Sequence, residues 1–195
     1  MSVKTVSKAQ NEIDALEKRI LDDKQRLAEL KRNQRPEEVD DYLLTESNGD
    51  LVRLSELFGG HDELILIHNM GKKCAYCTMW ADGFNGLYQH LENRAGFAVV
   101  SPDNPETQRE FAAGRGWKFK LCSAMGTSFI KDLGFEDDKG DFWPGVSTFI
   151  KKEGKIYRIA TDFFGPHDNY CSVWHFFDLL PSGESGWQPK FNYDN

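Results

Sequence analysis

The stretch ELILIHNMGKKCAYC, residues 63–77, decides the fold of this chain. Its first six residues contain the aliphatic run Leu64–Ile67, which is typical of a strand buried on both faces. From Cys77 to Leu91, apolar residues recur at spacings of three and four, which predicts an amphipathic helix. The stretch is therefore predicted to run from a buried strand, through a short loop, into a helix that begins at Cys74 and Cys77.

Downstream of this helix, strands and helices are predicted to alternate. We expect a second buried strand at 97–101 and then a helix up to about Arg115, with Asn104 as its N-cap and Pro105 at its first position. Strands separated by helices are most economically parallel, whereas two strands joined by a tight turn are antiparallel. The predicted fold is therefore α/β, a central mixed β-sheet flanked by helices. The other expected elements are strands at 42–45, 51–54, 117–122, 146–152 and 155–160, helical turns or short helices at 55–58 and 127–133, and a last helix at 169–180.

A long N-terminal helix is predicted before this domain. Residues 3–34 are highly charged and contain neither glycine nor proline, and Pro36 ends the pattern. A narrow apolar seam, interrupted only by Asp23, follows spacings of three and four, so the helix needs a partner, either its own domain or a second copy in a homodimer. The seam consists of Val6, Ala9, Ile13, Leu16, Ile20, Leu27 and Leu30. The expected organisation is a helical arm at 1–36, a domain at 41–181 and a C-terminal tail at 182–195.

Composition excludes several classes of protein. The chain has 195 residues, of which 39% are hydrophobic, enough for one core, and its net charge of -7 argues against nucleic acid or anionic lipid as partners. Its longest aliphatic run is far too short to span a membrane, and its first residues lack the apolar stretch of a secretory signal. Four cysteines are too few for a disulfide scaffold. We therefore expect a cytoplasmic protein with reduced thiols and no membrane partner.

The two cysteines at the start of the predicted helix carry the chemistry. A thiol at a helix N-terminus faces unpaired backbone N–H groups and the positive end of the helix dipole, and both favour the reactive thiolate. Lys72 and Lys73 add positive charge just before Cys74. Cys74 is predicted to attack a disulfide or an oxidant, and Cys77, one turn further into the helix, to resolve the mixed disulfide. This spacing in a chain with βαβ character indicates a thioredoxin-like redox pair.

Other readings of the same residues stay open. His68, six residues before Cys74, is the candidate base that takes the proton of Cys77, or it is a buried histidine held by hydrogen bonds. A Cys-x-x-Cys pair is also half of a zinc site, but no second close pair of ligands follows, so neither a metal nor another cofactor is expected. Cys122 is a third thiol at the same sheet edge or, more simply, a small buried hydrophobe. Cys171 is expected in the core side of the last helix.

The strand-to-cysteine stretch resembles that of thioredoxins, and nearly the whole chain resembles a bacterial thioredoxin-like family known as domain of unknown function 899. The resemblance is carried by LSELFGG at 54–60, CAYCTMWADGFNG at 74–86, GRGWKF at 114–119 and FDLLPSG at 177–183. It implies a thioredoxin-like fold with a long N-terminal helix. The family has no settled activity, so thiol-disulfide exchange on a small-molecule or protein disulfide is inferred from the fold and from the cysteines.

The resemblance also fixes where this chain departs from thioredoxins. Ser147 stands where they carry the cis-proline, and Lys73 stands where they carry a tryptophan. Around the pair, we expect Lys73, Tyr76, Trp80 and Ser147 to contact the substrate. Residues 69–73 contain neither the proline nor the threonine of a peroxiredoxin loop. A peroxiredoxin-like thiol peroxidase and a binding module without turnover remain the alternatives to a thiol-disulfide oxidoreductase.

Overall fold

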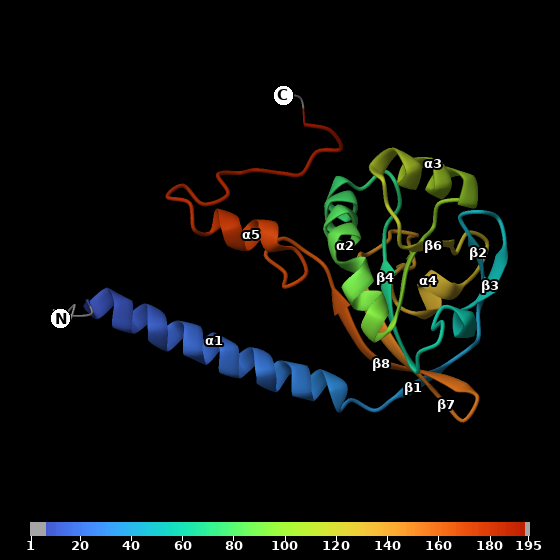
Figure 1. Ribbon diagram of the computed structural model, residues 1–195, viewed down its shortest axis with the longest axis horizontal. Coiled ribbons are helices and arrows are strands. Elements are labelled where there is room, and N and C mark those ends of the chain that lie inside the picture. The colour runs from blue at the N-terminus through green and yellow to red at the C-terminus, as the bar shows by residue number, and fades with distance from the viewer. Residues whose placement is uncertain (1–6, 194–195) are drawn as a thin grey trace. The chain divides into compact units, whose positions relative to one another are not determined.

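The structure is a computed structural model that describes residues 7–193. Contacts divide the chain into two compact units, Met1–Arg35 and Pro36–Asn195. The first unit contains helix α1, Lys8–Arg32 (Figure 1). The side chain of Ser7 caps this helix by accepting a hydrogen bond from the backbone N–H of Gln10 at 3.1 Å. The predicted long N-terminal helix is thus confirmed, although Val6 of its seam lies outside the described residues.

The apolar seam of α1 is exposed. No residue of the helix is buried, and Ile13, Leu16 and Ile20 keep 46%, 42% and 51% of their surface accessible to solvent. Leu27 and Leu30 are also exposed. The described residues of the predicted apolar seam therefore all belong to α1, and their side chains are accessible to solvent.

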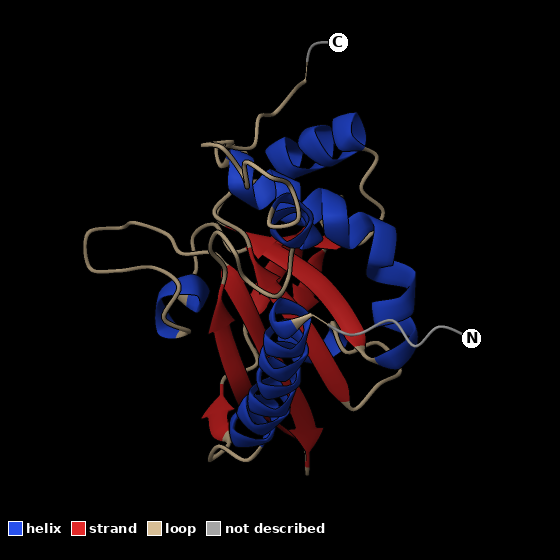
Figure 2. Ribbon diagram, turned by 90° about the vertical axis from the view of Figure 1, so that its left-hand side faces the viewer, coloured by secondary structure: helices blue, strands red, loops and turns tan. Residues whose placement is uncertain are grey.

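In the described part of the chain, eight strands of the second unit form one mixed sheet (Figure 2). Their order across the sheet is β1-β8-β7-β4-β5-β6-β2-β3. β4 pairs in parallel with β5, and β5 with β6, whereas the other neighbours are antiparallel. The predicted mixed sheet is therefore confirmed. The strands are β1 Glu37–Val39, β2 Leu43–Glu46, β3 Leu51–Arg53, β4 Glu63–His68, β5 Gly96–Ser101, β6 Lys120–Ser123, β7 Gly145–Lys152 and β8 Lys155–Phe163.

Helices pack on both faces of this sheet, because side chains alternate along its central strand β4. Leu64 and Leu66 belong to an α4-side cluster with Phe129, whereas Ile67 belongs to an α2-side cluster with Cys77. The α2-side cluster is completed by Trp80, Ala81, Phe84, Phe97, Val99, Phe119, Leu121 and Phe164. The helices of this unit are the 3₁₀ turn η1 Leu54–Glu56, then α2 Ala75–Arg94, α3 Pro105–Arg115, α4 Phe129–Asp132 and α5 Ser172–Phe177.

The structure differs from the sequence expectations at the edges of the sheet and at the last helix. Strand β1 was not predicted, because three residues give no readable pattern; it pairs with β8. Helix α5 is six residues long and begins at Ser172 rather than at residue 169. The carboxylate of Asp168 accepts hydrogen bonds from the backbone N–H groups of Tyr170 and Cys171, and this turn replaces the expected first helical turn. None of the described helices is long and apolar enough to cross a membrane.

Candidate redox site at the start of helix α2

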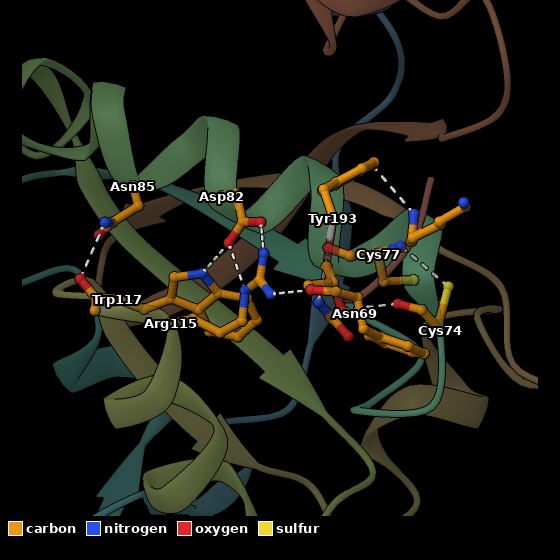
Figure 3. A network of polar contacts seen from close by, with 12 residues as sticks. Asn69, Cys74, Cys77, Asp82, Asn85, Arg115, Trp117 and Tyr193 are labelled. Atoms are coloured by element: carbon orange, nitrogen blue, oxygen red, sulfur yellow. Dashed lines mark hydrogen bonds and ion pairs between the residues drawn. The ribbon is translucent and has the colours of Figure 1, made fainter. Parts of the chain in front are cut away.

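Cys74 is the N-cap of α2, with extended backbone at φ -97° and ψ 107°. Its Sγ accepts a hydrogen bond from the backbone N–H of Cys77 at 3.0 Å, as a capping side chain does (Figure 3). Its carbonyl accepts a hydrogen bond from the Thr78 backbone N–H, also at 3.0 Å. Cys74 is half-buried, whereas Cys77 is buried in the α2-side cluster. One sulfur is thus open to a reactant and the other is sheltered, as the spacing predicts.

The two thiols acquire opposite acidities from this geometry. The hydrogen bond with the side chain of Cys77 lowers the pKa of Cys74 to about 7, against the opposing effect of burial, and the backbone N–H groups of Cys77 and Tyr76 lower it further. The same hydrogen bond, together with burial and the charge of Cys74, raises the pKa of Cys77 far above its usual value. Cys74 is therefore the thiolate of the pair, and Cys77 is the thiol that stabilises it.

The loop between β4 and α2 is held by Asn69, a residue that the sequence analysis missed. Its backbone N–H donates to the carbonyl of Val100 on β5 at 2.9 Å. Its Oδ1 accepts from the backbone N–H of Gly71 at 2.8 Å, and its Nδ2 donates to the carbonyl of Cys77 at 3.4 Å (Figure 3). The Asn-x-Gly spacing after a buried strand is a turn signal that could have identified it.

The ring of His68 packs against two phenylalanines of the core. Its ring stacks on Phe135 with 3.6 Å between ring centroids, and on Phe129 at 6.1 Å. Both phenylalanines belong to the α4-side cluster, on the face of the sheet opposite to that of Cys77. Burial lowers the pKa of His68 well below its usual value, so the imidazole is neutral at neutral pH. Its Nε2 lies 3.0 Å from the hydroxyl of Ser147, as the alternative of a buried histidine held by hydrogen bonds describes, and its role as a base stays a prediction.

The four expected substrate contacts fall into two groups. Lys73 is exposed and Tyr76 is half-buried, and both flank the pair. Trp80, 3% exposed, and Ser147, 0% exposed, are buried. Trp80 packs on Phe164 in the α2-side cluster, and Ser147 lies on β7 against His68. Both side chains are therefore core residues in this structure, and their contact with a substrate stays a prediction.

The other two cysteines pack against different clusters of the core. Cys122 is fully buried in the α4-side cluster, on the opposite face of the sheet from Cys77, so the simpler expectation of a small buried hydrophobe is confirmed. Cys171 is half-buried and packs against the α2-side cluster, but it is the N-cap of α5 and not a residue within that helix as expected. Within residues 7–193, no three side chains of histidine, cysteine, aspartate or glutamate gather as a metal site would require.

A second polar network braces α2 two turns beyond the pair. The carboxylate of Asp82 accepts hydrogen bonds from the side chain of Arg115 and from Trp117 Nε1, the latter at 2.7 Å (Figure 3). Arg115 also donates to the carbonyl of Phe191 at 2.7 Å, which ties the C-terminal tail to this network. Asn85 accepts from the backbone N–H of Lys118 at 2.9 Å. Helix α2 is therefore fixed to the segment between α3 and β6.

Residues 1–193 match the family described as bacterial protein of unknown function, DUF899. No curated protein matches the sequence. Among solved structures, peroxidoxin BcpB from Mycobacterium tuberculosis is similar with 24% identity and a TM-score of 0.53, over 66% of this chain and 84% of that one. A peroxiredoxin-like protein from Aquifex aeolicus has 19% identity and a TM-score of 0.52, over 66% and 74%. A hypothetical protein from Sinorhizobium meliloti 1021 has 13% identity and a TM-score of 0.53, over 82% and 88%. These similarities confirm the thioredoxin-like fold.

Proposed function

We propose that this chain, which belongs to the bacterial family of unknown function DUF899, is a thiol-disulfide oxidoreductase that uses Cys74 and Cys77. The observation that carries the proposal is the half-buried Cys74 sulfur, which caps α2 and hydrogen-bonds to the Cys77 side chain. With a pKa of about 7, roughly half of Cys74 is thiolate at neutral pH. An ordinary cysteine, with a pKa near 8.5, is only a few per cent thiolate there.

The first step is attack by the Cys74 thiolate on one sulfur of the substrate disulfide. A bond forms between Cys74 Sγ and that sulfur, the substrate S–S bond breaks, and the other substrate sulfur leaves as a thiolate that takes a proton. Lys73 is exposed beside Cys74 and is the side chain that we expect to attract an anionic leaving group. The substrate is a small-molecule or protein disulfide that can reach a half-buried sulfur.

The second step uses Cys77. Its pKa is high chiefly because its thiol hydrogen-bonds to Cys74 and faces the Cys74 charge. Once Cys74 is part of a mixed disulfide, that charge is gone and the Cys77 proton passes to solvent, from which the substrate thiolate that departs afterwards takes a proton. Cys77 then attacks Cys74 Sγ, the mixed disulfide breaks, and the second substrate thiol is released. The substrate has gained two electrons, and the protein has lost two in forming the Cys74–Cys77 bond.

The test is the single-turnover reaction with oxidised glutathione, followed by free-thiol titration of the wild type, Cys74→Ser and the matched control Cys171→Ser. We expect the wild type and the control to lose two thiols per chain, and Cys74→Ser to react at least about a thousandfold more slowly. Equal loss of thiols in Cys74→Ser and the wild type would exclude Cys74 as the nucleophile. Unreactive thiols in the wild type would favour the binding module instead.

Peroxide reduction is the second candidate, and the solved structures named as a peroxidoxin and a peroxiredoxin-like protein favour it. In that reaction the Cys74 thiolate attacks the peroxide O–O bond, an alcohol or water leaves, and Cys77 displaces water from the resulting sulfenic acid to form the same disulfide. The rates at which the two oxidants form the Cys74–Cys77 disulfide distinguish thiol-disulfide exchange from peroxide reduction. If hydrogen peroxide oxidises the pair faster than oxidised glutathione does at equal concentration, the protein is a thiol peroxidase.

The exposed seam of α1 supports a further part of the proposal, a homodimer in which two copies of the arm pair. A parallel pair would set the two Asp23 carboxylates opposite each other in the seam, so an antiparallel pair is favoured. In the full chain, Leu16→Glu with Ile20→Glu is expected to give monomers by sedimentation. The control Leu51→Glu, at an exposed leucine of the other unit, is expected to leave the dimer intact. A wild-type monomer would contradict the pairing.

The proposed location is the cytoplasm. Cys74, Cys77, Cys122 and Cys171 are free in this structure, and their number is too small for a disulfide scaffold. A dithiol in that compartment is kept reduced by the thiol pool and is therefore ready to attack an oxidised substrate.

A further inference from the structure

An aspartate on the neighbouring strand edge reaches into the loop that carries Cys74. Asp103 follows β5, and its Oδ2 accepts a hydrogen bond from the backbone N–H of Lys72 at 2.6 Å. Lys72 lies two residues before Cys74, so this bond fixes the backbone immediately ahead of the nucleophile. No step of the proposed reaction uses Asp103.

Buried groups of three different elements fix the position of Asp103 itself. Its backbone N–H donates to Ser101 Oγ at 3.3 Å, and its carbonyl accepts from Ser123 Oγ, at the end of β6, at 2.6 Å. Gln108 of α3 donates through Nε2 to the same Ser101 Oγ at 2.8 Å. Ser101, Ser123 and Gln108 are each at most 3% exposed. The backbone of Asp103 is therefore held directly by the ends of β5 and β6, and through Ser101 by α3.

The loop is shaped to receive this carboxylate. Gly71 has φ +97°, in the left-handed region that favours glycine, and a Cβ there would lie 2.8 Å from Asp103 Oδ2. From the other side, Asn69 Oδ1 accepts the backbone N–H of Gly71 at 2.8 Å. The side chains of Asn69 and Asp103 thus bind the consecutive backbone N–H groups of Gly71 and Lys72. Two residues later the chain reaches Cys74, the N-cap of α2.

We propose that Asp103 is a positioning residue that holds the loop so that the Cys74 sulfur meets the backbone N–H of Cys77. This inference rests on the proposed function and adds to it a residue that positions the nucleophile for the backbone hydrogen bond at Cys77, one of the contributions to its acidity. The charge of the carboxylate by itself disfavours a nearby thiolate. By positioning the loop, Asp103 lowers the pKa of Cys74, whereas by its negative charge it raises that pKa. Substitutions that remove the charge alone, or the charge together with the hydrogen-bond acceptor, can separate the two effects.

The experiment measures the pKa of Cys74 from the pH dependence of its alkylation by iodoacetamide, located by peptide mapping. In Asp103→Ala both the acceptor and the charge are lost. We expect the pKa of Cys74 to rise by about one unit, which makes alkylation at pH 6 about tenfold slower. Asp103→Asn keeps an acceptor oxygen for Lys72 and loses the charge, so its Cys74 pKa is expected to equal that of the wild type or to fall below it.

A matched control is Asp137→Ala. The Asp137 carboxylate also accepts backbone N–H groups within a loop, from Lys139 at 2.8 Å and from Asp141 at 3.0 Å. We expect this variant to leave the pKa of Cys74 unchanged. Ser123→Ala loosens Asp103 without altering its carboxylate and is expected to raise the pKa of Cys74 in the same direction as Asp103→Ala, by less. It keeps the test valid if Asp103→Ala does not fold.

Two results would overturn the inference. One is a Cys74 pKa in Asp103→Ala, or in Ser123→Ala if the alanine variant does not fold, that is no higher than in the wild type. The other is a rise in Asp103→Asn as large as in Asp103→Ala, since the asparagine keeps the acceptor. The proposed function fails separately, when Cys74 of the wild type is no more reactive at pH 7 than an ordinary cysteine.

Discussion

Within residues 7–193, two helices begin at a cysteine, and the pKa is lowered for one of those cysteines and raised for the other. Cys74 is the N-cap of α2 and Cys171 is the N-cap of α5; both have extended backbone and both are half-buried. The Cys74 sulfur accepts the capping hydrogen bond, and its pKa falls to about 7. Cys171 makes no side-chain capping hydrogen bond of this kind. Burial raises its pKa most, the backbone N–H of Val173 opposes that effect, and the charge of Asp168 raises the pKa further.

The comparison separates the contributions to a reactive thiol. Both cysteines have the N-cap position, but α2 has 20 residues and α5 has six, and only Cys74 has a second thiol one turn further in. The largest cause of the low pKa of Cys74 is the hydrogen bond from Cys77, with the backbone N–H groups contributing less. The backbone N–H groups at the start of α2 therefore lower the pKa of Cys74 less than the hydrogen bond from the Cys77 side chain does.

The largest change in this comparison is expected from Cys77→Ala. The variant removes the donor that Cys171 lacks, so the pKa of Cys74 should rise toward the ordinary value, by about one unit or more. The mixed disulfide between Cys74 and glutathione should also accumulate, because no resolving thiol remains. The pH dependence of Cys74 alkylation measures the pKa, and mass spectrometry after oxidised glutathione detects the mixed disulfide, with Cys171→Ser as control for both. An unchanged pKa of Cys74 would show that the backbone alone sets it.

A smaller contrast is expected in the pH dependence of the two cysteines. Because the thiolate is the reactive form, the alkylation rate of Cys74 should fall about tenfold per pH unit below pH 7 and level off above it. The pKa of Cys171 is raised, so its rate should still be rising where that of Cys74 is already level. Alkylation followed by peptide mapping from pH 5 to about 10 measures both residues in one sample. If the alkylation rates of Cys74 and Cys171 depended on pH in the same way, the two cysteines would not have the different pKa values assigned to them.

The smallest change is expected from Asp168→Asn. The asparagine keeps an oxygen for the backbone N–H groups of Tyr170 and Cys171 but removes the negative charge that raises the pKa of Cys171. Alkylation of Cys171 at pH 8 should become a few-fold faster, and that of Cys74 should not change. A change at Cys74 instead of Cys171 would mean that the two helix starts are electrostatically coupled.

The sequence predicted the strand, the loop and the paired cysteines, because the aliphatic run and the Cys-x-x-Cys spacing are local signals. The role of His68 could not be read in the same way. Alternation along β4 places it on the face of Leu64 and Leu66, but the sequence does not say which face α2 covers. Asp103 was missed for a related reason, since its contact with Lys72 joins residues 31 positions apart.

The central claim is that Cys74 and Cys77 form a reversible disulfide. Its most direct test is to equilibrate the protein with mixtures of reduced and oxidised glutathione and to map the disulfides by peptide mass spectrometry. We expect one intramolecular disulfide, between Cys74 and Cys77, that forms and breaks as the glutathione ratio changes. A chain that keeps both thiols free across the whole range, or that links either of them to Cys171 instead, would contradict it.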